Sequence, residues 1–160
     1  MTESSLDRPL RLYRTPVLPE WVDYNGHMTE SRYLEVMSEA TDAILHYVGV
    51  DGDYLARTGA YFTAESHVSF LDEVHAEEMV EVSTQVLAAD ERRLHLFHRL
   101  HRAGADAAVA ETETMLIHVD TSLLKASPFH AGPAARIAEV WAKHKHLPRP
   151  RYAGRTIGLS

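Results

Sequence analysis

The 160-residue sequence contains no cysteine. It therefore forms no disulfide, offers no thiolate nucleophile and holds no Cys-ligated zinc, which fits a reducing compartment. Its apolar runs are far shorter than the ~18 residues that span a bilayer, and residues 1–9 lack the apolar segment of a signal peptide. We therefore expect a cytoplasmic protein without a membrane partner.

Positive charge is also scarce, because 16 lysine and arginine residues accompany 23 aspartate and glutamate residues, for a formal net charge of −7. Nucleic acids bind concentrated basic surfaces, so no nucleic-acid partner is expected. The sequence also lacks a His-Glu-x-x-His zinc motif, a Gly-x-Ser-x-Gly nucleophile elbow and a glycine-rich phosphate loop. We expect no metal site and no cofactor.

The sequence does contain one long amphipathic segment, from Glu30 to Val48. Its apolar residues recur at alternating spacings of four and three residues, which is typical of a helix with one buried face. These residues are Tyr33, Met37, Ala40, Ile44 and Tyr47. Thr29 suits the N-cap and Gly49 the position after the last turn. We predict a helix of about five turns.

Directly before this helix, residues 21–29 read Trp-Val-Asp-Tyr-Asn-Gly-His-Met-Thr. The segment places a carboxylate, an amide and an imidazole beside a helix N-terminus, whose free N–H groups and dipole favour developing negative charge. Gly26 allows a tight turn or the close approach of a ligand. The segment is therefore the candidate site.

The remaining apolar pattern mostly alternates. Residues 10–17 form one expected strand, and residues 61–71, 79–88, 93–102 and 107–120 form four more. The short polar connections between the last four predict an antiparallel meander. Phe62, Ala64, Val68 and Phe70 are expected to share one face, with Tyr61 on the other.

Strands that are apolar on both faces must be covered on both. The long helix covers one face, so we expect a second sheet or another subunit on the other, and a homo-oligomer is the economical solution. A short helix at residues 133–145 and an extended tail should follow the sheet. The predicted organisation is a disordered start at residues 1–9, one domain at 10–125, and a C-terminal helix and tail at 126–160 packed on it.

Single residues of the candidate site have competing interpretations. Asp23 fits a turn or a cap, but Thr29 fills the cap position better, which favours a chemical role for Asp23. His27 fits a general base, a substrate hydrogen-bond donor or a buried structural histidine. Glu65 lies within an apolar strand, where a carboxylate faces either solvent or a pocket with a suitable occupant.

The Asp-x-x-Gly-His motif before a long helix and an antiparallel meander resembles the hotdog-fold acyl-CoA thioesterases of the 4-hydroxybenzoyl-CoA thioesterase type. Here the motif is Asp23 to His27, with Tyr33 downstream, and the resemblance covers roughly residues 10–125. It implies an α+β hotdog fold, in which an antiparallel β-sheet wraps a long central helix, followed by the short C-terminal helix and tail.

Within that superfamily the chain is most similar to the betainyl-CoA thioesterases of carnitine degradation, which also occur fused to carnitine dehydrogenase. The matching stretches are residues 19–30, 93–98, 115–120, 147–150 and 153–155. The resemblance implies hydrolysis of a small acyl-CoA, with betainyl-CoA as the expected substrate. It also implies a homodimer or tetramer with its site between two subunits.

The resemblance assigns catalysis to Asp23, acting either as a nucleophile on the thioester carbonyl or as the base for an attacking water. Backbone N–H groups around residues 26–30 would polarise the carbonyl oxygen. Asn25 and His27 are expected to orient water or substrate. Relatives often carry Asn at the position of Thr29, so a role for that side chain does not transfer.

The trimethylammonium group of betaine should contact aromatic faces or a carboxylate. The substrate-binding candidates are Trp21, Tyr24, Gly26, Met28, Tyr61, Phe62 and Glu65. Arginines suited to the phosphates of coenzyme A are Arg92 and Arg93 at a hairpin end and Arg149, Arg151 and Arg155 in the tail. One other function stays open, a hotdog module that binds acyl-CoA without hydrolysis, which would need neither Asp23 nor His27. A hotdog hydratase or dehydratase lacks support, because its usual His and acidic pair is expected further along the chain in a different local pattern.

Overall fold

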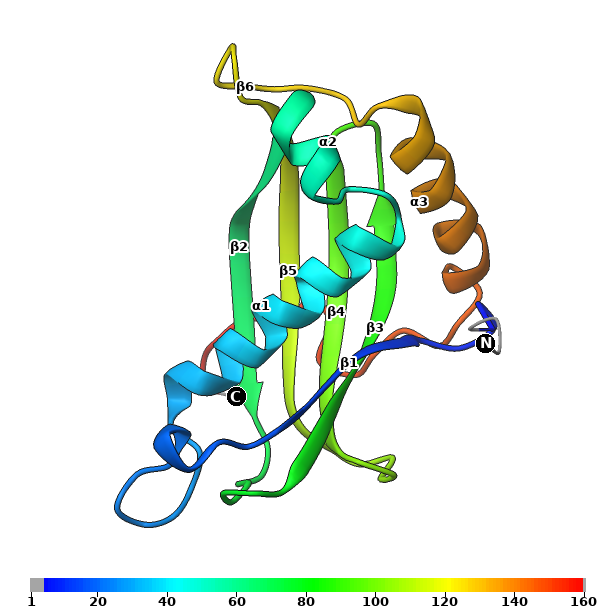
Figure 1. Ribbon diagram of the computed structural model, residues 1–160. Coiled ribbons are helices and arrows are strands. Elements are labelled where there is room, and N and C mark those ends of the chain that lie inside the picture. Colours follow the sequence, from blue (N-terminus) through cyan, green and yellow to red (C-terminus); the bar gives the residue numbers. More distant parts are fainter. Residues whose placement is uncertain (1–4, 160) are drawn as a thin grey trace.

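The computed structural model describes residues 5–159 (Figure 1). Its elements are β1 (Leu10–Pro16), η1 (Pro19–Trp21), α1 (Glu30–Tyr47), α2 (Gly52–Arg57), β2 (Ala60–Phe70), β3 (Met79–Ala89), β4 (Arg93–Arg102), β5 (Ala108–Asp120), β6 (Lys125–Ala126) and α3 (Ala131–His144). Helix and strand periodicity therefore placed each main element within a few residues of its observed bounds.

The strands form one antiparallel sheet in the order β1-β3-β4-β5-β2, with β6 beside β5. The predicted meander is correct for β3, β4 and β5 but wrong for β2, which pairs with β5 instead of β3. The link at residues 71–78 passes the ends of the strands between them (Figure 1). Eight residues reach ~26 Å when extended, and three strand spacings measure only ~14 Å, so a short link does not force its two strands to pair.

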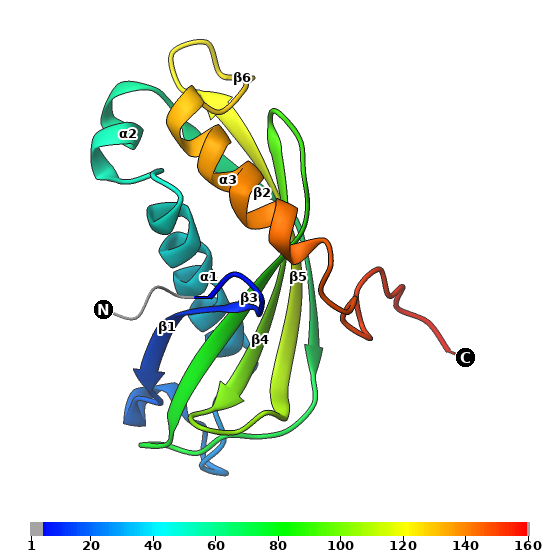
Figure 2. The same ribbon diagram turned by 90° about the vertical axis from the view of Figure 1, so that its right-hand side faces the viewer.

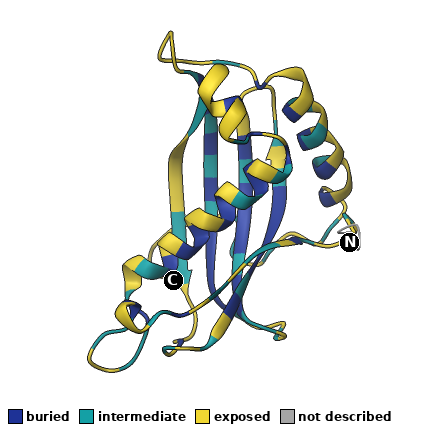
Figure 3. Ribbon diagram, viewed as in Figure 1, coloured by how far each residue is buried: buried dark blue, intermediate teal, exposed yellow. Residues whose placement is uncertain are grey.

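Helix α1 crosses one face of the curled sheet, and its buried side faces the strands (Figures 1 and 3). Met37, Ala40 and Ile44 are buried there as the spacing predicted. Gly49 has φ of 98°, as expected of the residue that ends a helix in the left-handed region. Thr29 occupies the N-cap with an extended backbone, but its side chain makes no capping hydrogen bond.

Helix α3 packs beside α1 at the β3 end of the sheet. Its residues Ile137 and Val140 join a buried cluster with Ile44 of α1 and Leu94 of β4. The two helices therefore extend one continuous core over the same face.

The opposite face is covered in part by the chain's own tail, and the expected second sheet or subunit there stays a prediction. A row of residues on this face contains Gln85, Phe97 and Glu113, which are paired across β3, β4 and β5. The Gln85 side chain donates to the carbonyl oxygen of Pro148 at 3.3 Å, and the Gly154 N–H donates to Glu113 Oε2 at 2.6 Å. Figure 2 shows the tail on the side of the sheet away from α1.

A β-bulge at Ala64 changes which residues of β2 share a face. The register moves from Thr63 opposite Leu116 to Glu65 opposite Met115, so Ala64 is an extra residue. The prediction that Phe62, Ala64, Val68 and Phe70 face the same way is therefore wrong. Before the bulge Tyr61 faces α1 and Phe62 faces away, whereas Val68 and Phe70 beyond the bulge face the α1 side.

The expected disordered start at residues 1–9 falls partly on residues 1–4, outside the described residues. Leu6 packs against the buried cluster that contains Leu10. Among residues 5–159, no helix combines the length and apolarity needed to cross a bilayer.

Candidate active site

The motif before α1 folds as a tight hairpin. Val22 and Met28 form an antiparallel bridge, the Asp23 N–H donates to the His27 carbonyl at 3.0 Å, and the Gly26 N–H donates to the Asp23 carbonyl at 2.9 Å. Gly26 has φ of 79°, a conformation that a side chain disfavours. The glycine thus allows the chain to reverse within the motif.

The Asp23 carboxylate is held by this hairpin. Its Oδ1 accepts the Asn25 N–H at 2.8 Å and the His27 N–H at 3.3 Å. Asp23 is therefore a turn residue, which is one of the two structural roles that the sequence allowed for it. The turn fixes the orientation of the carboxylate, and Oδ2 receives no hydrogen bond from residues 5–159, so one oxygen is left for chemistry.

Most backbone donors of the motif are already engaged. The Met28 N–H donates to the Val74 carbonyl at 2.8 Å and the Thr29 N–H donates to the Trp21 carbonyl at 2.9 Å. Within the described chain, the unpaired donors at the start of α1 are the N–H groups of Glu30 and Ser31. Together with the helix dipole, these two groups form the best position for a developing oxyanion.

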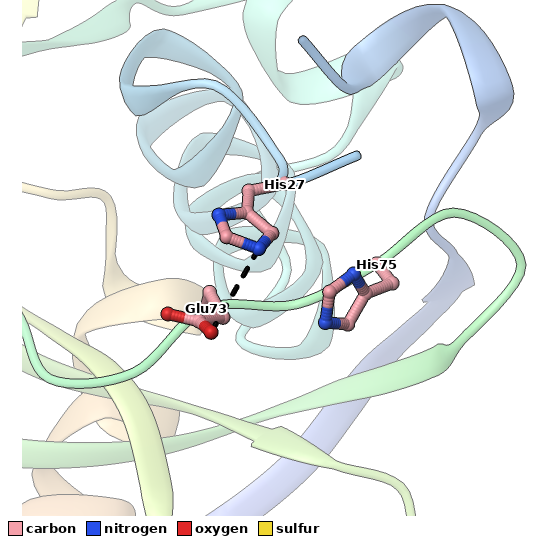
Figure 4. Close-up of side chains that lie close together, drawn as sticks. All are labelled: His27, Glu73 and His75. Atoms are coloured by element: carbon pink, nitrogen blue, oxygen red, sulfur yellow. Dashed lines mark ion pairs between the residues drawn. The ribbon is translucent and has the colours of Figure 1, made fainter. Parts of the chain in front are cut away.

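His27 faces a second segment, the link between β2 and β3. Its Nε2 lies 3.7 Å from Glu73 Oε1, and its ring meets the His75 ring edge to face at 4.9 Å between centroids (Figure 4). His27 and His75 are also paired by a backbone bridge. Beside them lies an open depression of about 470 Å³, lined by His27, Glu30, Tyr33 and Glu73 among others.

The proposed acyl-binding residues are dispersed in one chain. Trp21 and Met28 are 8% and 4% exposed and belong to the core, whereas Tyr24 at the hairpin tip is 97% exposed. Tyr61 and Phe62 start β2, at the end of that strand away from the hairpin (Figure 1). A single chain therefore does not bring these aromatic residues to Asp23.

The three β2 candidates also differ in their surroundings. The Tyr61 hydroxyl donates to Asp42 Oδ1 of α1, and burial together with this carboxylate raises the pKa of Tyr61, so the phenol stays protonated. Phe62 is 59% exposed, and Glu65 is also exposed. Both face away from α1, so their assignment to the acyl group stays a prediction.

The arginines proposed for coenzyme A already have partners in several cases. Arg92 pairs with Glu91 at 3.0 Å and Arg93 with Asp90 at 2.7 Å. Arg149 is exposed and makes no ion pair within residues 5–159. Two further tail arginines, Arg151 and Arg155, lie over the Tyr152 ring at 5.5 and 5.1 Å.

Sequence reasoning missed a polar cleft of about 200 Å³ between α1 and the adjoining strands β2 and β5. Its lining includes the hydroxyl groups of Ser38, Thr41, Thr63, Ser66, Thr112 and Thr114. Behind it His98 is fully buried, with Nε2 2.9 Å from Thr41 Oγ1 and Nδ1 2.8 Å from Thr84 Oγ1. Burial lowers the pKa of His98 to about 4, so the ring is neutral. The alternation of Thr112 and Thr114 was the available signal for this polar stripe.

Comparison with known proteins agrees with this architecture. The model of a family described as the thioesterase-like superfamily matches residues 17–137. A betainyl-CoA thioesterase from Pseudomonas aeruginosa is 43% identical over 155 residues, which cover 96% of this chain and 98% of that protein. A fused L-carnitine dehydrogenase/betainyl-CoA thioesterase from Rhizobium meliloti is 39% identical over 150 residues, which cover 94% of this chain and 30% of that longer protein.

Among solved structures, one from Pseudomonas putida KT2440 assigned to the thioesterases superposes with a TM-score of 0.82 at 39% identity. The match covers 95% of this chain and 97% of that one. The predicted hotdog architecture is thereby confirmed. The chain belongs to the thioesterase-like superfamily and is a thioester hydrolase.

Proposed function

We propose that this protein hydrolyses betainyl-CoA to betaine and coenzyme A, as a step of carnitine degradation in the cytoplasm, where acyl-CoA thioesters are handled. The observation that supports betainyl-CoA as the substrate is the 43% identity, over nearly the full length of both chains, to a betainyl-CoA thioesterase. The free Asp23 oxygen and the unpaired donors at the start of α1 supply the two groups that the chemistry requires.

In the proposed reaction, Asp23 either attacks the thioester carbonyl, giving an anhydride that water then cleaves, or takes a proton from an attacking water. The carbonyl oxygen gains negative charge in both routes, and the Glu30 and Ser31 N–H groups stabilise it. In the first route the C–S bond breaks as the anhydride forms, and in the second it breaks after water has added to the carbonyl. In both routes the coenzyme A thiolate leaves and takes up a proton. Asn25 and His27, one on each side of Gly26, orient water or substrate.

The active assembly in this proposal is a dimer built through β2. This strand is the outer edge of the sheet beyond β5, and it carries a row of backbone groups that another strand can pair with. Antiparallel pairing of two β2 strands about Glu65, with the extra residue Ala64 outside the pairing, places the partner subunit's Tyr61 beside Val68 on the helix side. The aromatic start of one β2 then approaches the hairpin of the other subunit. Recognition of the trimethylammonium group and attack by Asp23 are thereby combined at the interface.

Release of free coenzyme A from a panel of short acyl-CoAs, betainyl-CoA included, tests the activity. The wild type and the control Asp53→Asn, an exposed carboxylate on α2, should favour betainyl-CoA. Asp23→Asn should lose at least about 100-fold in kcat/KM while keeping the fold and the oligomer. Hydrolysis that persists in Asp23→Asn would refute the mechanism, and release from no thioester by the folded wild type would refute the function.

Complementation between inactive variants tests the shared site. Mixing Asp23→Asn with Tyr61→Ala makes dimers in which one of the two sites lacks both substitutions, so up to about a quarter of the wild-type activity should return. Mixing Asp23→Asn with Asp23→Ala is the control, because every site in that mixture carries a substituted Asp23 and no intact site forms. Equal recovery in both mixtures, or a fully active monomer by light scattering, would contradict the interface.

A further inference from the structure

We propose that His27, Glu73 and His75 form a binding site for one divalent transition-metal ion of the zinc class, and that its occupation inhibits hydrolysis. One nitrogen from each histidine and one oxygen of Glu73 all lie within 4.8 Å of one another. The residues come from two segments 46 positions apart, the hairpin before α1 and the link between β2 and β3 (Figure 4).

The backbone already holds these segments together. His27 and His75 form a bridge pair, so their side chains leave the two segments on the same side. The Met28 N–H donates to Val74 at 2.8 Å, and the His75 N–H donates to Glu78 Oε2 at 2.7 Å. Ligands around a tetrahedral zinc ion are about 3.3 Å apart, and His27 Nε2 is 3.7 Å from Glu73 Oε1. Since all three donor atoms lie within 4.8 Å of one another, each donor–donor distance needs to shorten by no more than ~1.5 Å to fit one ion.

The donor set selects the metal class. Two imidazoles and one carboxylate suit Zn²⁺, Ni²⁺ or Cu²⁺, whereas Mg²⁺ prefers a shell of oxygen ligands. The neighbouring acids Asp72 and Glu78 pair with Arg102 at 3.0 and 3.3 Å, so they do not compete for the ion. Three protein ligands leave a fourth position open to water.

The consequence for hydrolysis rests on the proposed function. His27 and Glu73 line the depression of about 470 Å³ in front of the α1 N-terminus. An ion bound between them fixes His27, adds bulk at the rim and removes the imidazole from the reacting groups. The protein would thus lose activity when free zinc rises and recover it when a chelator removes the metal.

Calorimetric titration of tag-free protein with Zn²⁺ tests the site independently of catalysis. The wild type should bind one ion per chain, and His75→Ala and Glu73→Gln should weaken binding by more than about tenfold. His46→Ala, another exposed histidine, is the matched control and should bind as the wild type does. Mg²⁺ should give no saturable binding at the same concentrations. Absence of saturable zinc binding, or equal binding by His75→Ala, would overturn the site.

Coenzyme A release with and without Zn²⁺ tests the inhibition. Zinc should inhibit the wild type and His46→Ala but spare His75→Ala, whose activity without metal should equal that of the wild type. If zinc binds the three residues and hydrolysis continues at the same rate, the proposed inhibition is refuted. If the folded wild type hydrolyses no thioester, the proposed function fails and the calorimetry still decides the metal site.

Discussion

Acid should destabilise this protein well above the range in which carboxylates titrate, because His98 is buried as a neutral ring. Its imidazole is enclosed between Thr41 of α1 and Thr84 of β3, and among residues 5–159 burial is the only cause that shifts its pKa. Burial lowers the pKa of His98 to about 4 from an ordinary 6.5. The unfolded chain therefore binds a proton that the native protein excludes between these two pH values.

The sign and size follow from that difference. The native pKa is the lower one, so the stabilisation is fully present above pH 6.5 and is lost as the pH falls toward 4. One pKa unit corresponds to about 1.4 kcal/mol, so His98 alone should remove about 1.4 kcal/mol of unfolding free energy by pH 5.5 and about 2–3 kcal/mol by pH 4.5. Burial also lowers the pKa values of His101, His118 and His144, and these act in the same direction.

Urea unfolding followed by circular dichroism from pH 7.5 to 4.5 measures this effect. His98→Gln keeps hydrogen-bonding groups between the two threonines but cannot titrate, so its stability should fall less steeply with acid than that of the wild type. His46→Gln, at an exposed position of α1, should keep the wild-type slope. Equal slopes for His98→Gln and the wild type would refute the argument that the ring is held neutral.

Three further predictions concern stability and the geometry of the motif. Gly59→Ala should lower the unfolding free energy by about 2–3 kcal/mol, measured by urea titration, because a Cβ there would lie 2.4 Å from the Val119 carbonyl oxygen. Gly26→Ala should cost about 1–2 kcal/mol from its φ of 79° and lower kcat, because the same turn holds Asp23. Arg99→Leu should cost about 1–3 kcal/mol in thermal melts because it leaves the buried Glu111, now paired at 2.8 Å, without its cation, and adding Glu111→Gln should restore part of the loss.

Local features of the sequence were sufficient for the elements. The apolar spacing gave the helix that is observed as α1, and Gly49 ended it because its backbone has positive φ. The position of β2 in the sheet could not be predicted in this way, because β2 pairs with β5, a strand far away in the sequence. The bulge at Ala64 could not be predicted either, because a strand with a bulge has the same kinds of residues as a strand without one. The one extra residue nevertheless moves the side chains that precede it to the opposite faces of the sheet.

In the candidate site, too, the features within one local segment could be predicted and the contacts between distant segments could not. The turn formed by Asp23 and Gly26 could be predicted because it lies within one local segment, whereas their roles in catalysis and substrate binding stay predictions. The pairing of His27 with Glu73 and His75 could not be predicted, because it arises where two distant segments form a bridge. The engaged donors of Met28 and Thr29 were also unforeseen, because a helix N-terminus offers only those N–H groups that the tertiary structure leaves unpaired.

The length of β2 makes the proposed reaction depend on assembly. Tyr61 and Phe70 are nine residues apart on one extended strand, so they are separated by ~30 Å, much more than the size of a betainyl group. An aromatic contact to the acyl group and attack by Asp23 at the other end of the strand therefore cannot involve the same copy of β2. Antiparallel pairing of two copies removes this distance, because it sets the start of one strand beside the end of the other. Because of the bulge, Tyr61 of the second copy faces the helix side of the sheet and Phe62 faces the other side.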